Sequence, residues 1–114
     1  MEDNTKVDVL RFRPGLIDLI TEGVKTNTWR IWTDKYVSVG DDVQLINSET
    51  DQVFARAQII EKCEKSFADL TDNEKQGHES FESEEDMYQY YSEYYKIAVD
   101  ENTSVTVIKF QIIN

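Results

Sequence analysis

The chain has few of the residues on which several common kinds of site depend. Its 114 residues include one cysteine, Cys63, and one histidine, His78. An internal disulfide needs two cysteines, and a structural zinc site needs about four cysteine or histidine ligands, so the sequence excludes both. We expect no metal and no other cofactor, and any catalysis must then use other side chains.

Long hydrophobic runs are also absent. No apolar stretch approaches the roughly 20 residues that a membrane-spanning helix needs, and the first residues, MEDNTKVD, are acidic, unlike the basic start of a secretory signal. The sequence therefore predicts a cytoplasmic protein with no membrane segment. Its length and its 39% content of hydrophobic residues suit one compact core, so we expect a single domain over residues 1–114.

Positive charge is scarce as well. Twelve lysines and arginines face 23 aspartates and glutamates, which gives a formal net charge of -11. Residues 1–35 hold equal numbers of each sign, so the whole excess lies beyond residue 35. Tight binding of long RNA or DNA depends on neutralising phosphates, and such a negative field opposes it. We expect a small ligand or a very local contact with RNA.

The hydrophobic pattern predicts an α+β fold. Pro14 suits the first position of a helix, and Gly23 suits its end. Ser66 and Ser83 each precede an aspartate by three residues, as in a capping box, and predict two more helices. A polar turn at 48–52 predicts a hairpin, and sequential antiparallel pairing predicts a small, partly open barrel. The predicted strands are 7–12, 29–32, 43–46, 53–60 and 104–113.

Residues 23–30, GVKTNTWR, place reactive side chains between a helix end and a strand, where ligands often bind. Lys25 can act as a general base if burial lowers its pKa, but a close carboxylate would raise that pKa, and the sequence does not decide between them. Thr28 can act as a nucleophile beside a base. Arg30 can bind a carbonyl or a phosphate, or anchor an acidic neighbour. On the residues alone, an exposed polar loop without function is the commoner explanation.

Four segments of the chain follow the order of motifs in a known family. Residues 16–30, LIDLITEGVKTNTWR, match an apolar helix followed by the signature G-x-K-x-x-T-x-R. Residues 39–43 (VGDDV), 80–83 (SFES) and 105–110 (VTVIKF) are similar to the start of a barrel strand, the opening of the last helix and the terminal strand. The chain thus resembles ASCH domains, a branch of the PUA-like superfamily. The resemblance implies a PUA-like small mixed β-barrel of five to six strands with flanking helices.

The resemblance also implies an activity. Small bacterial ASCH domains are amidohydrolases that remove the acetyl group from acetylated cytidine, and the lysine, threonine and glutamate they use correspond to Lys25, Thr28 and Glu79. Glu74 and Glu82 lie close by and are alternatives for the carboxylate. In the implied mechanism Lys25 takes the proton of Thr28, Thr28 attacks the acyl carbonyl, and the glutamate orients Lys25 or protonates the leaving amine.

Substrate contacts are expected from the same segment. We expect Thr26, Trp29 and Arg30 to contact the substrate, and the rings of Trp29, Trp32 or Tyr36 can stack on a base. Alternation along the strand makes at least one tryptophan a core residue. Other members of the superfamily bind RNA without hydrolysing it, so a non-catalytic RNA-binding module is the alternative function. A nuclease that uses a divalent ion ranks third, because it needs converging carboxylates.

The remaining candidates have simpler interpretations. His78 lies in a polar segment, and we expect a solvated side chain. Met87, Tyr91, Tyr94 and Tyr95 fall on one face of the last predicted helix. That face is expected to pack against the core rather than to form a binding surface.

Overall fold

The structure is a computed structural model that describes residues 8–31 and 37–113. Val7, Trp32 and Tyr36, which the sequence predictions include, lie outside the described residues. Within the described ranges, no helix is long and apolar enough to cross a bilayer. The elements are β1 (Asp8–Phe12), α1 (Pro14–Thr21), β2 (Asn27–Arg30), β3 (Asp42–Asn47), β4 (Val53–Ser66), a 3₁₀ turn (Phe67–Asp69), α2 (Asp72–Gln76), α3 (Glu84–Tyr95) and β5 (Ser104–Ile113).

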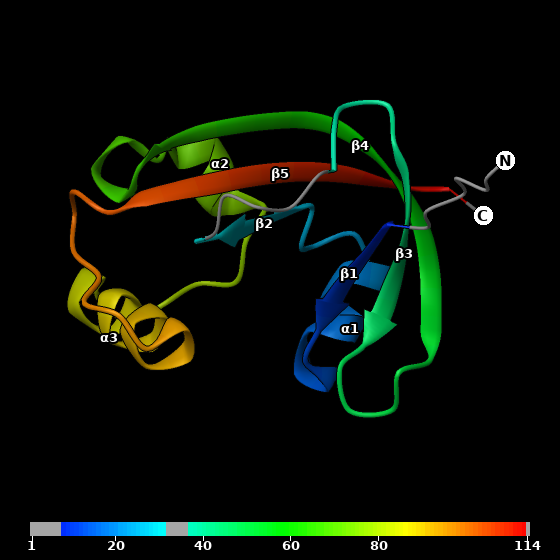
Figure 1. The fold of residues 1–114 in the computed structure, drawn as a ribbon, viewed down its shortest axis with the longest axis horizontal. Coiled ribbons are helices and arrows are strands. Elements are labelled where there is room, and N and C mark those ends of the chain that lie inside the picture. The colour runs from blue at the N-terminus through cyan, green and yellow to red at the C-terminus, as the bar shows by residue number, and fades with distance from the viewer. Residues whose placement is uncertain (1–7, 32–36, 114) are drawn as a thin grey trace, which may run out of the picture.

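The described strands form one mixed sheet in the order β1-β3-β4-β5-β2. It curls into a half-barrel with helices around it (Figure 1), which confirms the predicted α+β class and the partly open mixed barrel. The hairpin of β3 and β4 is antiparallel, as predicted. The consecutive strands β4 and β5 also pair antiparallel. The expectation of sequential antiparallel pairing is wrong for the first two strands, because β1 runs parallel to β3 and β2 pairs with β5. A connection through a helix lets two strands run in the same direction.

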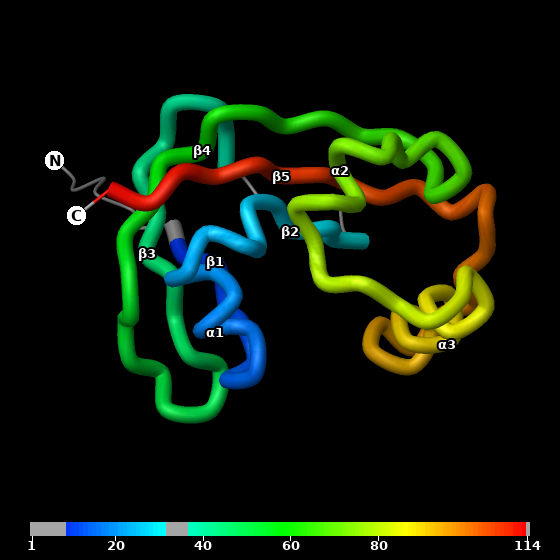
Figure 2. Tube along the Cα trace, turned by 180° about the vertical axis from the view of Figure 1, so that it is seen from behind, coloured from blue at the N-terminus to red at the C-terminus, as the bar shows by residue number. Residues whose placement is uncertain are grey.

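The long strands β4 and β5 connect two apolar clusters. The first lies between α1 and the part of the sheet that contains β1, and it includes the fully buried Leu45, Ile59 and Ile108. The second lies between the sheet and α3 and includes Trp29 and Phe67. As a result, α1 and α3 stand at opposite ends of the curled sheet, with β2 between them (Figure 2).

Helix α1 ends in a tight turn that sets the direction of β2. Gly23 has a φ of 83°, a conformation that residues with a Cβ rarely adopt. The N–H groups of Val24 and Lys25 then both donate to the carbonyl of Leu19 at 2.9 Å. The predicted helix end at Gly23 is confirmed. Because the chain turns so sharply, the Lys25 side chain points inward, and the residue is only 2% exposed.

The segment after α2 docks on the start of β2. The Gly77 carbonyl accepts hydrogen bonds from the N–H groups of Thr26 and Asn27, at 2.8 and 3.2 Å. The Asn27 side chain donates to the carbonyl of Glu74 at 2.9 Å. A Cβ at Gly77 would lie 2.2 Å from Thr26 Oγ1, so glycine is the residue that permits this approach. The docking brings the residues that follow Gly77 beside β2.

The helix starts after β4 differ in part from the prediction. β4 continues to Ser66, and the Ser66 side chain caps no backbone N–H, because the chain closes there into a 3₁₀ turn. The actual cap is Thr71, which exchanges hydrogen bonds with Glu74 in a complete capping box. Ser83 caps α3 as predicted, by accepting from the N–H of Asp86.

Replacing Thr71 with alanine tests the assignment of this cap. We expect the free energy of unfolding to fall by about 1 kcal/mol, because the N–H of Glu74 loses its acceptor. Ser66→Ala is the matched control and should change the free energy by less than about 0.5 kcal/mol. Urea denaturation followed by circular dichroism measures both. A larger loss for Ser66→Ala than for Thr71→Ala would contradict the assignment.

Candidate active site

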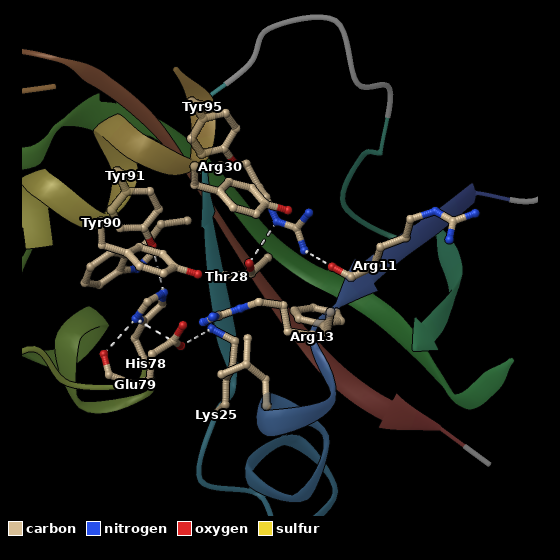
Figure 3. A pocket seen from close by; sticks show the side chains of 14 residues that line it. Arg11, Arg13, Lys25, Thr28, Arg30, His78, Glu79, Tyr90, Tyr91 and Tyr95 are labelled. Atoms are coloured by element: carbon tan, nitrogen blue, oxygen red, sulfur yellow. Dashed lines mark hydrogen bonds and ion pairs between the residues drawn. The ribbon is translucent and has the colours of Figure 1, made fainter. Parts of the chain in front are cut away.

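A small pocket lies where β2 meets the start of α1 and the end of α3 (Figure 3). Its volume is about 50 Å³. Its lining comes from four parts of the chain that are distant in sequence. The lining residues are Arg11, Phe12, Arg13, Leu16, Lys25, Thr28, Trp29, Arg30, His78, Glu79, Tyr90, Tyr91, Tyr94 and Tyr95.

Lys25 and Glu79 form a buried ion pair in this pocket. Lys25 Nζ lies 2.6 Å from Glu79 Oε1, and the side chains are 1% and 18% exposed. The other two candidate carboxylates lie elsewhere: Glu74 pairs with Lys65 at 2.9 Å, and the exposed Glu82 does not line the pocket. Of the three glutamates considered from the sequence, the structure brings Glu79 to Lys25.

The environment of the pair favours a neutral lysine more than usual. Burial lowers the pKa of Lys25 from 10.5 to about 8, although the charge and hydrogen bond of Glu79 oppose this shift. The sequence leaves open whether burial or a close carboxylate decides the pKa of Lys25, and in the structure burial has the larger effect. Burial would raise the pKa of Glu79, but the adjacent Lys25 charge and hydrogen bond keep that pKa below its usual value. At neutral pH the carboxylate stays ionised, and part of the lysine population is a free amine that can accept a proton.

Thr28 and Arg30 are two residues apart on β2 and in direct contact. Arg30 Nε donates to Thr28 Oγ1 at 2.9 Å, and Arg30 Nη2 donates to the carbonyl of Arg11 at 3.1 Å. The Thr28 oxygen thus accepts from a cation, which leaves its own proton available to a base. Among the described residues, no direct hydrogen bond joins Thr28 to Lys25, although both side chains point into the pocket (Figure 3).

His78 is buried in the site, so the prediction of a solvated side chain is wrong. The residue is 5% exposed, and its ring stacks on Trp29 with 3.6 Å between centroids. Nδ1 lies 2.9 Å from the carbonyl of Glu79 and 3.2 Å from Glu79 Oε1. Both atoms are acceptors, which assigns the proton to Nδ1. Nε2 then accepts from the Tyr91 hydroxyl at 3.3 Å.

His78 remains uncharged over the physiological range. Burial lowers its pKa from 6.5 to about 3, and the nearby Lys25 charge acts in the same direction. As a neutral donor, it orients the Glu79 carboxylate without competing for its charge. Sequence reasoning missed this role because the flanking residues are polar. The available signal was position, since the single histidine directly follows Gly77 and directly precedes Glu79.

Two of the predicted substrate contacts have other surroundings. Thr26 lines a separate hollow beside Gly77, outside the pocket of Lys25, because its backbone is bonded to Gly77 and its side chain lies over that glycine. Trp29 lines the pocket but is 4% exposed, with His78 stacked on its ring. This placement fits the core tryptophan predicted from strand alternation and leaves little ring surface for a base.

The last turns of α3 face the pocket. Met87 and Tyr91 are buried as predicted, whereas Tyr94 is 58% exposed, and the prediction that it packs in the core is wrong. Tyr94 lines the pocket and has no place in the apolar cluster, whereas Tyr95 beside it is partly buried against that cluster. The rings of Tyr90 and Tyr94 stack with 6.2 Å between centroids. Aromatic surface is therefore available at the pocket mouth, from α3 rather than from β2.

Carboxylates do not converge here. Glu79 is the one carboxylate among the described residues that line the pocket. Over ranges 8–31 and 37–113, no group of three or more histidine, cysteine, aspartate or glutamate side chains could hold a metal ion. The donor set that the nuclease alternative requires is not assembled by these residues.

Solved structures share this fold. A protein from Enterococcus faecalis V583, described under the family model DUF984, aligns with a TM-score of 0.79 and 16% identity over 97% of this chain and 82% of that chain. An ASCH protein from Zymomonas mobilis aligns with a TM-score of 0.67 and 15% identity over 93% of this chain and 71% of that chain. An ASCH domain from Lactobacillus crispatus JV V101 aligns with a TM-score of 0.59 and 12% identity over 83% and 68%.

These likenesses establish the fold, and the resemblance to ASCH domains that the sequence suggested is confirmed at that level. No protein-family model matches the chain. No curated protein matches it either.

The ionisation of Lys25 can be measured by NMR with ¹³C-labelled lysine. We expect Lys25 to titrate near pH 8, because burial lowers its pKa, and Lys65 above its usual 10.5, because the hydrogen bond to Glu74 raises its pKa. Glu79→Gln should lower the pKa of Lys25 further, and Glu74→Gln is the control that should not. A Lys25 signal that titrates near 10.5 would refute the effect of burial.

His78 gives an unambiguous NMR signal because it is the single histidine. We expect a proton on Nδ1 and no titration between pH 5 and 8. In the unfolded chain His78 binds a proton near pH 6.5, and in the folded chain only near pH 3. The contribution of His78 to the free energy of unfolding therefore decreases as the pH falls from 6.5 to 3. Tyr91→Phe should shift the Nε2 resonance, whereas Tyr88→Phe should not. A midpoint near 6.5 would contradict the burial of the ring.

Proposed function

We propose that this protein is a small amidohydrolase that acts on an acylated pyrimidine nucleoside, such as acetylated cytidine, or on a related small amide. The observation that carries the proposal is the buried Lys25–Glu79 pair beside the Thr28 hydroxyl, which accepts from Arg30. A base, a nucleophile and an ionised carboxylate in one pocket are the groups that acyl transfer requires. The likeness of fold to ASCH structures supports the same reading.

In the proposed mechanism Lys25 begins as a neutral amine. It takes the Thr28 proton, directly or through a water, while the Thr28 oxygen bonds to the acyl carbon. The bond between that carbon and the amine nitrogen then breaks, and the Lys25 ammonium returns the proton to the leaving amine. A water hydrolyses the acyl-threonine and completes the cycle. Each step leaves the total charge of the site unchanged.

Electrostatics favour one of the two roles considered for Glu79. A carboxyl group whose pKa lies below its usual value carries no proton at neutral pH, so it cannot be the acid that protonates the leaving amine. As a carboxylate it stabilises the Lys25 ammonium that forms during attack. Glu79 is therefore proposed to orient Lys25 and to support its protonated state.

The size of the pocket fits the acyl end of the substrate. A space of about 50 Å³ accommodates a group of acetyl size but not a whole nucleoside. The pyrimidine would lie at the mouth, where Tyr90 and the exposed Tyr94 present their rings. Stacking on such rings tolerates different bases.

Turnover of acetylated cytidine tests the proposal. Lys25→Ala, Thr28→Ala and Glu79→Gln should each lower kcat/KM by about 100-fold or more, because each removes a group that acts in the transition state. Thr28→Ser retains the hydroxyl and should retain a measurable part of the activity. Glu82→Gln is the matched control for Glu79→Gln and should behave like the wild type.

Two results would reject this site. One is turnover that survives all three substitutions. The other is the absence of turnover with any acylated nucleoside, together with salt-sensitive RNA binding that Arg30→Ala weakens, which would favour the non-catalytic RNA-binding module.

A further inference from the structure

The charge around the pocket has the opposite sign to that of the chain. The chain as a whole carries a formal charge of -11. Among the described residues that line the pocket, one is a carboxylate and four are cations, of which three direct the charged group to the pocket. These cations are Arg11, Arg13, Lys25 and Arg30. The proposed site is therefore locally positive, although the protein as a whole is negative.

Three of these cations already have partners. Lys25 pairs with Glu79, and Arg30 donates to a hydroxyl on its own strand. The guanidinium of Arg11 pairs with Asp51 and points away from the pocket, to which Arg11 contributes its backbone (Figure 3). None of the three needs an additional anion.

Arg13 differs from them. It is exposed, and within the described residues it pairs with no acidic side chain. Its guanidinium carbon lies 5.0 Å from the centre of the Tyr90 ring, so the side chain reaches across the pocket mouth from the start of α1 to α3 (Figure 3). A cation–π contact at an exposed ring is weak compared with a bidentate bond to an oxyanion, so an anionic group could displace the ring.

The backbone beside Arg13 adds to the positive field. Arg13 occupies the N-cap position of α1, where its side chain caps no N–H, and no acidic residue lies in the first turn. The N-terminal end of a helix carries partial positive charge. A Cβ on Gly15 would meet no atom within 4 Å, so the chain there is open to a ligand.

We propose that Arg13 binds a negatively charged group of the substrate, a phosphate or a carboxylate, while the acylated nitrogen lies at Thr28. This inference rests on the proposed function and adds to it a preference for anionic over neutral acyl amides. Because the pocket accommodates only the acyl end, the remainder of the molecule lies at the mouth, where Arg13 crosses. One anionic group suits this place, whereas a long polyanion would meet the acidic residues beyond residue 35.

Matched substrates test the inference. Acetylated cytidine is the neutral substrate, its 5′-monophosphate carries a phosphate, and its derivative oxidised to the acid at C5′ carries a carboxylate, so both charges lie at the end of the molecule away from the acyl group. At least one charged substrate should have a KM about tenfold lower than the neutral one, with a similar kcat, as expected for one charge-assisted contact. Comparison of the KM values of the two charged substrates shows whether Arg13 binds a phosphate or a carboxylate more tightly.

The variants separate Arg13 from general charge. Arg13→Gln should remove the preference for the charged substrate, and Arg13→Lys should keep part of it. Arg56→Gln is the control, since Arg56 is exposed and lies 3.6 Å from Asp42 outside the pocket. The inference is overturned if the wild type shows equal KM values, if the preference survives Arg13→Gln, or if Arg56→Gln removes it equally.

Equilibrium binding distinguishes this inference from the proposed function. If none of the three compounds is hydrolysed, the proposed function fails, and their affinities are compared by titration calorimetry. Tighter binding of a charged compound, lost in Arg13→Gln and weakened by added salt, supports an anion site without catalysis. Equal affinities for the neutral and charged compounds overturn it.

Discussion

Two N–H groups at the start of β2 donate to the carbonyl of Gly77, where a Cβ would collide with the Thr26 hydroxyl. The rest of the site depends on this contact. It places His78 against Trp29 and Glu79 against Lys25, although 54 positions separate the two members of the ion pair. At the end of α1, Gly23 makes the tight turn that directs Lys25 inward and leads the chain into β2. Two glycines therefore set the geometry, and the charged groups occupy the positions that the backbone leaves to them.

The two lysine–glutamate ion pairs show how burial, rather than pairing, determines the pKa of the lysine. Lys65 and Lys25 each bond to a glutamate at under 3 Å, yet the pKa of Lys65 is raised and that of Lys25 is lowered. The Lys65 side chain is partly hydrated and gains from its partner. The Lys25 side chain has lost nearly all of its water, a cost that one carboxylate does not offset. The Lys65–Glu74 pair thus keeps a charged lysine, whereas in the Lys25–Glu79 pair the lysine can lose its proton near neutral pH.

The sequence predicted the fold class, most strands and the place of Lys25, Thr28 and Arg30 in one site, because helix ends, strand patterns and the Lys25–Arg30 segment are local features. Glu79 came from the resemblance to ASCH domains, with Glu74 and Glu82 as alternatives. The sequence did not predict the pairing of β2 with β5 or the parallel pairing of β1 with β3, which depend on long-range closure. It also misjudged His78 and Tyr94. Both errors have one cause, since polarity and helical periodicity describe a residue's neighbours in sequence, and here contacts between distant segments decide exposure.

The position of β2 has a consequence for how the protein acquires its site. β2 is fixed on one side by β5, with Asn27 opposite Lys109, and on the other by the segment after α2. Contacts between residues so distant in sequence form late compared with local helices, because chain closure must precede them. During synthesis, Lys25 leaves the ribosome long before Glu79, and Glu79 leaves it before β5, the strand that pairs with β2. A partly made chain therefore has a hydrated, fully protonated Lys25 with an ordinary pKa, and the reactive amine exists only once the sheet has closed.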